Sequence, residues 1–181
     1  NAMRVIAGTL GGRQLLAPKG WQVRPTSERV REALFSALGD ISGMKTADLY
    51  CGTGALGIEA ISRGAANSVL VDRDTRPAIG NVHNLGLLDR TELVRADAVS
   101  FLSGDAGRRL FDLIFIDPPY RMAAEAAEEL DRLLPAALAP GGRVVVECAA
   151  RMPLDLPSLE VVRQRRYGRT VVTFLEEASQ E

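Results

Sequence analysis

The amino-acid sequence predicts an α/β fold with a doubly wound, mostly parallel sheet of seven strands and helices on both faces. Three observations predict it. From Thr46 onward, apolar runs of strand length alternate with segments of helical character, as in parallel sheets with helical crossovers. Near the carboxyl end, two strand-like runs flank Tyr167-Gly168 and indicate a closing antiparallel hairpin. The length of 181 residues suits one domain with a sizeable core.

Each expected strand is a short apolar run that ends at a polar or glycine-rich segment. The first run leads into a glycine-rich turn, and Pro140-Gly141-Gly142 turns the chain into the last parallel run. The expected parallel strands span residues 47–51, 69–72, 92–95, 112–117 and 143–148, and the hairpin spans residues 161–166 and 170–175. The expected helices between them span residues 56–63, 75–87, 98–102 and 123–138.

Residues 1–45 differ in kind from residues 46–181, and we expect them to form a basic extension of the main domain. Residues 4–7 and 13–16 are short strand-like pieces among glycines, and a helix is expected from about Ser27. Thr26 suits the N-cap of that helix, because its hydroxyl can accept a bond from a free backbone N–H.

The helix expected from Ser27 has one apolar face that would pack on the sheet. Glu28 lies in its first turn, where the helix dipole favours negative charge. The spacing leaves Arg29 and Arg31 on the exposed flanks. The apolar positions are Val30, Ala33, Leu34, Ala37 and Leu38.

Charge is unevenly divided along the chain. Residues 1–45 carry seven basic and three acidic residues, a net charge of +4, whereas residues 46–150 carry ten basic and fifteen acidic residues, a net charge of −5. This division favours a polyanionic partner bound from one side, although ordinary surface charge is an alternative.

Cys51 and Cys148 show neither disulfide nor metal-ligand spacing. No apolar run approaches the ~20 residues of a membrane span, so we expect a reduced, cytoplasmic, metal-free protein.

The motif Asp117-Pro118-Pro119-Tyr120 directly follows the apolar run of residues 113–116. A buried parallel strand would place Asp117 at its carboxyl end, where open α/β sheets bind their ligands. The Asp117 carboxylate and the Pro118 carbonyl can then accept hydrogen bonds from one amine, and Tyr120 can stack on the base that carries it. The motif therefore indicates an amine methyltransferase site with Asp117, Pro118, Pro119 and Tyr120 as catalytic residues. A simple turn after a strand is the alternative.

Acidic side chains and a glycine turn predict a cofactor site. Gly52-x-Gly54-x-x-Gly57 follows the first strand, and Asp72 lies 20 residues after Gly52, where a ribose-binding carboxylate is expected. Asp48, before the turn, suits the ammonium of S-adenosylmethionine and would repel a pyrophosphate. Asp97, after the third strand, can accept from the adenine amine. The expected cofactor-binding residues are Asp48, Tyr50, Gly52, Gly54, Asp72, Asp97 and Ala98. Each acid also has a structural alternative, such as a cap or a turn.

These motifs make the chain resemble class I S-adenosylmethionine-dependent methyltransferases, and more narrowly the bacterial family that methylates N2 of guanine 966 in 16S ribosomal RNA. The most specific segments are Arg4-Val5-Ile6-Ala7-Gly8, the Gly12-Arg13 pair, residues 24–35 and residues 48–59, together with Asp-Pro-Pro-Tyr. The resemblance covers almost the whole chain.

The resemblance implies methyl transfer to a guanine N2 amine in 16S ribosomal RNA of the assembled or nearly assembled small subunit. We expect the protein to be a monomer. A base must be unpaired or flipped out before its atoms can react, and RNA is read mostly at exposed loops. The expected RNA-binding residues are Arg4, Arg13, Arg24, Arg29, Arg31 and Arg121. Arginines of the closing hairpin, Arg163, Arg165, Arg166 and Arg169, could also reach phosphate or could simply face solvent.

Two other functions stay open on the sequence alone. The first is methylation of adenine N6, or of another amine, in DNA or RNA. Sequence-specific DNA enzymes of this kind generally carry a separate recognition domain, for which residues 1–45 leave no room. The second is a nicotinamide-dependent or non-catalytic Rossmann protein, because the glycine pattern followed by Asp72 also fits that cofactor.

Overall fold

The computed structural model describes residues 3–20, 25–104 and 108–179, and within them it shows a seven-stranded sheet. The strand order is β5-β4-β3-β6-β7-β9-β8. β3 to β7 run parallel to their neighbours, whereas β9 is antiparallel to both β7 and β8. The strands are β3 (Lys45–Leu49), β4 (Asn67–Asp72), β5 (Thr91–Arg95), β6 (Phe111–Ile116), β7 (Leu138–Ala149), β8 (Leu159–Tyr167) and β9 (Thr170–Glu177). The expected fold class is confirmed.

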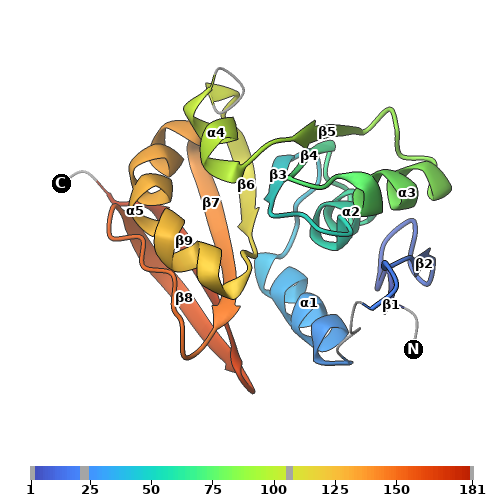
Figure 1. Ribbon diagram of the computed structural model, residues 1–181, viewed down its shortest axis with the longest axis horizontal. Helices are drawn as coiled ribbons and strands as arrows, with labels where there is room; N and C mark the ends of the chain where they lie inside the picture. The colour runs from blue at the N-terminus through green and yellow to red at the C-terminus, as the bar shows by residue number, and fades with distance from the viewer. Residues whose placement is uncertain (1–2, 21–24, 105–107, 180–181) are drawn as a thin grey trace.

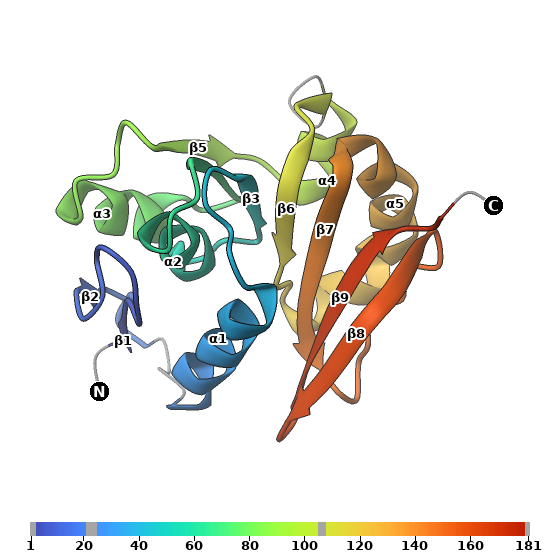
Figure 2. The same cartoon turned by 180° about the vertical axis from the view of Figure 1, so that it is seen from behind.

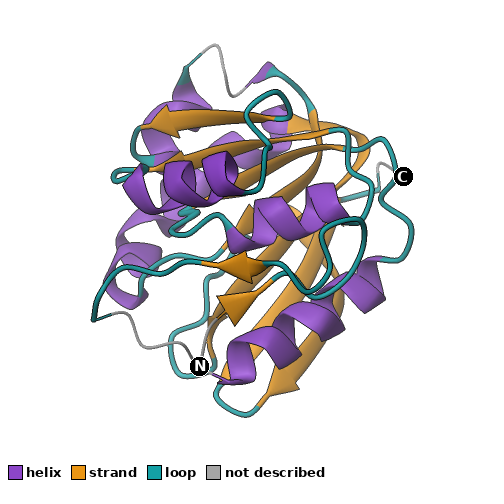
Figure 3. Cartoon of the chain, turned by 90° about the vertical axis from the view of Figure 1, so that its right-hand side faces the viewer, coloured by secondary structure: helices purple, strands orange, loops and turns teal. Residues whose placement is uncertain are grey.

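Helices cover both faces of the sheet (Figure 1, Figure 2, Figure 3). One face packs against α1 (Pro25–Leu38), α2 (Ala55–Ser62) and α3 (Arg76–Asn84), and the other packs against α4 (Ala98–Ser103) and α5 (Tyr120–Ala137). β6 is apolar because both of its faces are buried. Leu113 and Phe115 belong to the core under α1, and Ile114 and Ile116 to the core under α4 and α5. No helix in the described parts of the chain could cross a membrane.

Several boundaries differ from the expected ones, among them those of α1, α5 and β7. α1 begins at Pro25, so Thr26 lies inside the helix and is not its N-cap. Proline suits the first helical position because no N–H is needed there. α5 begins at Tyr120, with Pro119 as its N-cap. β7 begins at Leu138, and the chain bends at residues 140–142 within the strand, where the register with β6 shifts.

The N-terminal arm, residues 3–20, contains a small antiparallel pair of two-residue strands, β1 (Met3–Arg4) and β2 (Gln14–Leu15). The arm lies against α2 and α3 (Figure 1), where Val5 and Leu15 are buried beside Ile58. Gly8 permits this close approach: its φ is +82°, and a Cβ there would lie 1.9 Å from the Ser62 carbonyl oxygen.

A buried carboxylate on α2 fastens the arm and α1 together. Glu59 is fully buried and accepts hydrogen bonds from the N–H groups of Ile6, at 2.8 Å, and Ala7, at 3.1 Å. Its oxygens also lie 3.0 Å from Arg63 Nε and 3.6 Å from Arg31 Nε. The two guanidinium groups and two N–H groups therefore compensate the carboxylate in place of water.

Arg31 is not on an exposed flank, and that prediction was wrong. Its side chain is only 4% exposed, and it donates a hydrogen bond to the Arg4 carbonyl oxygen besides pairing with Glu59. Burial is the main cause that lowers the pKa of Arg31, while the Glu59 charge opposes it. Arg29 is exposed as expected, and Val30, Leu34 and Leu38 are buried in the core.

We expect Glu59→Ala to lower the free energy of unfolding by about 3–5 kcal/mol, because Arg31 would stay buried without its partner. Urea denaturation measures this loss. The matched control is Glu32→Ala, since Glu32 pairs with Arg63 at the surface and is 52% exposed. The control should lose no more than about 1 kcal/mol. Equal losses in the two variants would show that the buried network does not fasten the arm.

Candidate active site

The carboxyl ends of β3 and β6 meet at the point where the strand order reverses. From β3 the chain builds β4 and β5 on one side, then crosses to β6 and β7 on the other. Open α/β sheets bind their ligands in the crevice at such a switch point. The glycine turn follows β3, and Asp117 follows β6, so the two sequence motifs lie on adjacent strands of this crevice.

The glycine turn is held by side chains from other elements. The Gly52 N–H donates to Asp72 Oδ2 at 2.9 Å, and the Asp74 N–H donates to Asp72 Oδ1 at 3.0 Å. The Thr53 carbonyl oxygen accepts from Asn81 Nδ2 at 2.9 Å. Gly54 is the N-cap of α2 and has a φ of +82°. These bonds fix both the turn and the carboxylate of Asp72.

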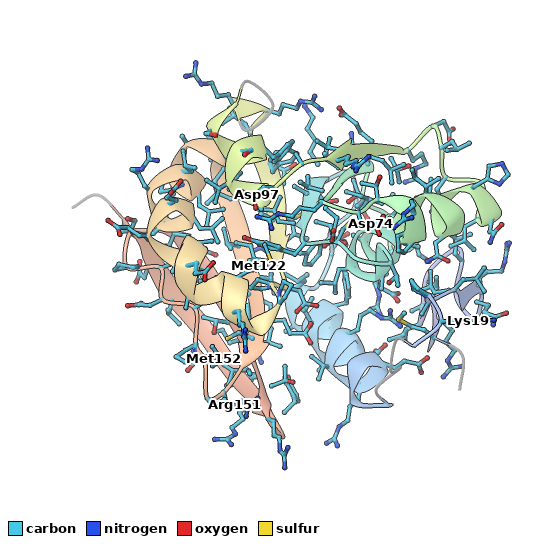
Figure 4. All side chains as sticks on the ribbon, in the orientation of Figure 1. Lys19, Asp74, Asp97, Met122, Arg151 and Met152 are labelled. Carbon is cyan, nitrogen blue, oxygen red and sulfur yellow. The ribbon has the colours of Figure 1, made fainter. Side chains whose placement is uncertain are left out.

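A small pocket lies beside the turn and contains most of the expected cofactor residues. Asp97 and Met122, which face this region from opposite sides, are labelled in Figure 4. The pocket brings together Asp72 at the end of β4, Asp97 after β5 and Pro119 of the Asp-Pro-Pro-Tyr motif. The lining residues are Tyr50, Val71, Asp72, Arg73, Ala96, Asp97, Ala98, Pro119 and Met122.

Tyr50 gives this pocket an unsatisfied polar group. Its hydroxyl is buried and has no hydrogen-bond partner among the described residues. Burial, followed by the Asp97 charge, raises the pKa of Tyr50 to about 12, so the hydroxyl keeps its proton at neutral pH. A buried donor without a partner is costly, and a polar ligand can remove that cost. With two carboxylates and apolar walls nearby, the pocket lining has the hydrogen-bonding and apolar groups that a nucleoside needs.

Asp72 and Asp97 differ in how they are held. Asp72 accepts two backbone N–H bonds, and each carboxylate oxygen retains capacity for a further donor. Asp97 stands at the N-cap position of α4 but makes no side-chain cap bond, and its Oδ1 accepts from Arg73 at 3.2 Å instead. The structural alternative for Asp97, a helix cap, is therefore confirmed in part. Asp97 occupies the N-cap position of α4, but its side chain does not cap the helix.

Asp48 is not part of the pocket wall. Its side chain is 1% exposed, and its Oδ2 accepts the Gly57 N–H at 2.9 Å beneath α2. Gly57 allows this packing, because a Cβ there would lie 2.4 Å from Leu70 and 2.6 Å from Ser68 Oγ. The expectation that Asp48 offers its carboxylate to a ligand's ammonium does not fit this burial. Its hydrogen bond to the Gly57 N–H instead supports the first turn of α2, directly after the glycine turn.

The catalytic motif emerges from the sheet at the edge of the pocket. Asp117 and Pro119 are exposed, Pro118 is buried, and Tyr120 is the first residue of α5. The Tyr120 side chain lies outside the described structure. Because Pro119 lines the pocket, the Asp-Pro-Pro-Tyr motif and four of the expected cofactor residues share one wall.

The expected RNA-binding arginines fall into different environments. Arg13, Arg29 and Arg121 are exposed, and Arg4 is 61% exposed but pairs with Glu28 at 3.4 Å. Arg31 is buried in the Glu59 network, and Arg24 lies outside the described residues. The exposed basic charge of residues 1–45 is therefore smaller than the sequence suggests.

Three residues at the site were not predicted from the sequence: Asn81, Arg73 and Met122. Asn81 is 1% exposed and exchanges two hydrogen bonds with the backbone of Leu16, at 2.7 and 2.9 Å, besides its bond to Thr53. Asn81 follows Ala78 by three residues on the buried face of α3. A polar residue at such an apolar position was the available signal.

We expect Asp48→Asn to gain stability relative to the wild type as the pH rises from about 4 to 8. Burial raises the pKa of Asp48 to about 8, whereas the unfolded chain releases this proton near pH 4. The wild type therefore loses stability between these values. Asparagine keeps an oxygen for the Gly57 N–H but does not titrate. Urea denaturation at pH 5, 6.5 and 8 measures the difference, and a constant difference would contradict the assignment.

Comparisons with known proteins agree with this geometry. The family model described as Conserved hypothetical protein 95 matches residues 3–176. The Putative rRNA methyltransferase YlbH of Bacillus subtilis is 35% identical over 95% of this chain and 97% of its own length. The Ribosomal RNA small subunit methyltransferase D of Escherichia coli K12 is 37% identical over 66% of this chain and 61% of its own length.

A solved structure supports the fold. The solved structure described as Putative methyltransferase yhhF from Escherichia coli superimposes with a TM-score of 0.82 at 29% identity, covering 99% of this chain and 100% of the other. A methyltransferase replaces the nicotinamide-dependent and non-catalytic alternatives. The resemblance to the bacterial small-subunit ribosomal RNA methyltransferases is confirmed, and the chain belongs to the Conserved hypothetical protein 95 family.

Proposed function

We propose that this protein transfers a methyl group from S-adenosylmethionine to the exocyclic N2 amine of a guanine in small-subunit ribosomal RNA. One observation carries the proposal: Pro119 of the Asp-Pro-Pro-Tyr motif lines the same pocket as Asp72 and Asp97. An amine held by the motif would therefore lie next to a bound nucleoside cofactor. The names of the Bacillus subtilis and Escherichia coli relatives support ribosomal RNA as the substrate class.

The pocket residues suit the parts of the cofactor. Asp72 would accept the ribose hydroxyls, and Asp97, with the Tyr50 hydroxyl nearby, would bind the adenine end. The glycine turn lies where the amino-acid portion would pass. When bound, S-adenosylmethionine supplies an electrophilic methyl group. Asp72 is already oriented by the Gly52 and Asp74 N–H groups, so its carboxylate loses little freedom when a ribose arrives.

The catalytic motif would make the amine reactive. A guanine N2 amine is a poor nucleophile because its lone pair is delocalised into the ring. The Asp117 carboxylate and the Pro118 carbonyl, accepting its two hydrogens, would favour the pyramidal amine and direct its lone pair toward the methyl group. Tyr120 would stack on the base, and Asp117 would take the released proton.

We further propose a division of labour between residues 1–45 and residues 46–181. The main domain would hold the cofactor and the base, and residues 1–45 would contact RNA through Arg4, Arg13, Arg24 and Arg29. Arg121, exposed in the first turn of α5, would approach the backbone next to the target base. The arm is small, so specificity would depend on a target loop held open by the assembled subunit.

Methyl incorporation from labelled S-adenosylmethionine tests the function directly. The substrates are small subunits from cells that lack the enzyme, deproteinised 16S RNA and duplex DNA, each digested to nucleosides after reaction. We expect N2-methylguanosine, formed fastest on the subunits. Methylated adenine on DNA would reject the proposal.

Asp117→Asn should lower the rate of transfer at least a hundredfold, because the amide lacks the charge that orients the amine and accepts its proton. Its affinity for S-adenosylmethionine should stay within twofold of the wild type. Asp112→Asn is the control, because Asp112 lies at the other end of β6, where it accepts a hydrogen bond from the Lys45 N–H at 2.9 Å. Near-normal turnover of Asp117→Asn would remove the motif from the reaction.

Asp72→Asn should weaken S-adenosylmethionine binding by about 1.5–3 kcal/mol, the value of hydrogen bonds to a charged group. Asparagine still offers one oxygen to the Gly52 N–H, whereas the exposed Asp74 N–H loses its acceptor. Calorimetry on the purified protein measures the change. The control is Asp74→Asn, two residues away, whose carboxylate faces solvent and binds Arg76. If both variants bind as tightly as the wild type, Asp72 is not a ribose ligand.

A further inference from the structure

The hairpin of β8 and β9 ends at the same edge of the sheet as the catalytic motif. β9 is antiparallel to β7 and to β8, so β8 runs parallel to β7 and β6. The turn between β8 and β9 therefore lies at the carboxyl edge. Thr170 pairs with Ala149 at the end of β7, and the Ala150 N–H donates to the Arg169 carbonyl oxygen at 2.8 Å. In Figure 1 and Figure 2 the hairpin tip projects beyond the neighbouring strands.

Basic charge is concentrated on this hairpin. Four exposed arginines lie near its tip, and the only acidic residue of β8 is Glu160. Among the described residues none of the four forms an ion pair. Arg165 and Arg166 donate only to the carbonyl oxygens of Gln164 and Gly168. We call the four the hairpin arginines: Arg163, Arg165, Arg166 and Arg169.

β8 is also uncovered on both faces. Residues 160–166 are all exposed, in contrast to the buried central strands. Arg163 and Arg165 lie opposite Phe174 and Val172, on the face toward α1, and Arg166 lies opposite Val171 on the other face. Their charges therefore surround the strand instead of forming one stripe. Arg151, which follows β7, lies toward the same tip in Figure 4.

The N-terminal arm, residues 3–20, offers less unpaired basic charge than this hairpin. Arg4 is paired with Glu28, which leaves Arg13 and Lys19 as its exposed basic residues without an ion pair among the described residues. In α1, Arg29 is exposed, but Arg31 is buried against Glu59. The arm packs on α2 and α3, whereas the hairpin lies beyond β7, so the catalytic crevice between β3 and β6 separates the two basic surfaces.

We propose that the hairpin arginines bind the phosphate backbone of the RNA substrate, on the side of the target base opposite the arm. This inference rests on the proposed function for the identity of the polyanion. Guanidinium groups bind phosphate oxygens through paired hydrogen bonds, and they carry charge at any working pH. Two basic surfaces flanking the crevice would hold the strand on both sides of the base that enters it.

The test removes three charges from the tip in the variant Arg165→Ala/Arg166→Ala/Arg169→Ala. The control, Lys45→Ala/Arg108→Ala/Arg132→Ala, removes three charges from exposed residues away from the carboxyl edge. Binding to deproteinised 16S RNA is measured over a series of salt concentrations. Each phosphate contact contributes about 0.7 to the log–log slope on single-stranded RNA. The tip variant should lose about 2 from the slope, and the control should keep the wild-type slope.

A second variant separates charge from folding. Replacing the same three arginines with lysine should restore most of the slope, because lysine keeps the charge that phosphate binding needs. On small subunits the alanine variant should raise KM at least fivefold with kcat and S-adenosylmethionine affinity unchanged. Equal slopes for the tip variant and the control would overturn the inference.

The outcomes also distinguish this inference from the proposed function. If the wild type methylates subunits and the tip variant binds RNA as the control does, the function stands and the hairpin inference fails. If the wild type methylates no RNA but the slope still falls, the function fails and the hairpin remains an RNA-binding surface. A defect on assembled subunits without one on deproteinised RNA would assign the hairpin to a ribosomal protein and overturn the inference.

Discussion

The burial of the Glu59 carboxylate is the constraint on which the arrangement of the chain around the site depends. A carboxylate without water is tolerated only when charged and hydrogen-bonding partners replace its hydration. Glu59 obtains them from the arm, from α1 through Arg31 and from its own helix through Arg63. Each partner has a narrow range of allowed positions. One side chain therefore fixes the relative positions of the arm, α1 and α2, which are separate segments of the sequence.

Buried hydrogen bonds also connect the arm to the glycine turn. α2, which carries Glu59, begins at Gly54, the end of the glycine turn. Asn81 on α3 bonds both to Leu16 at the end of the arm and to Thr53 in the turn. Because these polar groups are buried, breaking any of the bonds leaves a group unsatisfied. The arm and the turn are consequently packed together as one unit. The division between residues 1–45 and residues 46–181 therefore separates regions of different charge, and it does not separate two packing units.

Local patterns were sufficient to predict the strands, the hairpin and the position of the catalytic motif. β6 illustrates why: its apolar run and the motif that ends it are contiguous, and burial on both faces leaves no other place for the run. Arg31 illustrates the opposite case. Helical spacing placed it on a flank, but its partner Glu59 lies 28 residues away. The sequence likewise did not predict the burial of Asp48, whose depth beneath α2 depends on Gly57 and Leu70.

The distribution of charge follows from what the proposed reaction must bring together. Asp72, Asp97 and Asp117 make the carboxyl edge of β4, β5 and β6 acidic, which suits a cationic cofactor and an amine. The same charges repel phosphate, so an RNA backbone cannot be held at the centre of the crevice. Cationic groups must then stand to either side, within reach of the flanking phosphates. A base that crosses this acidic centre has to leave its stack, and the reaction requires the same displacement.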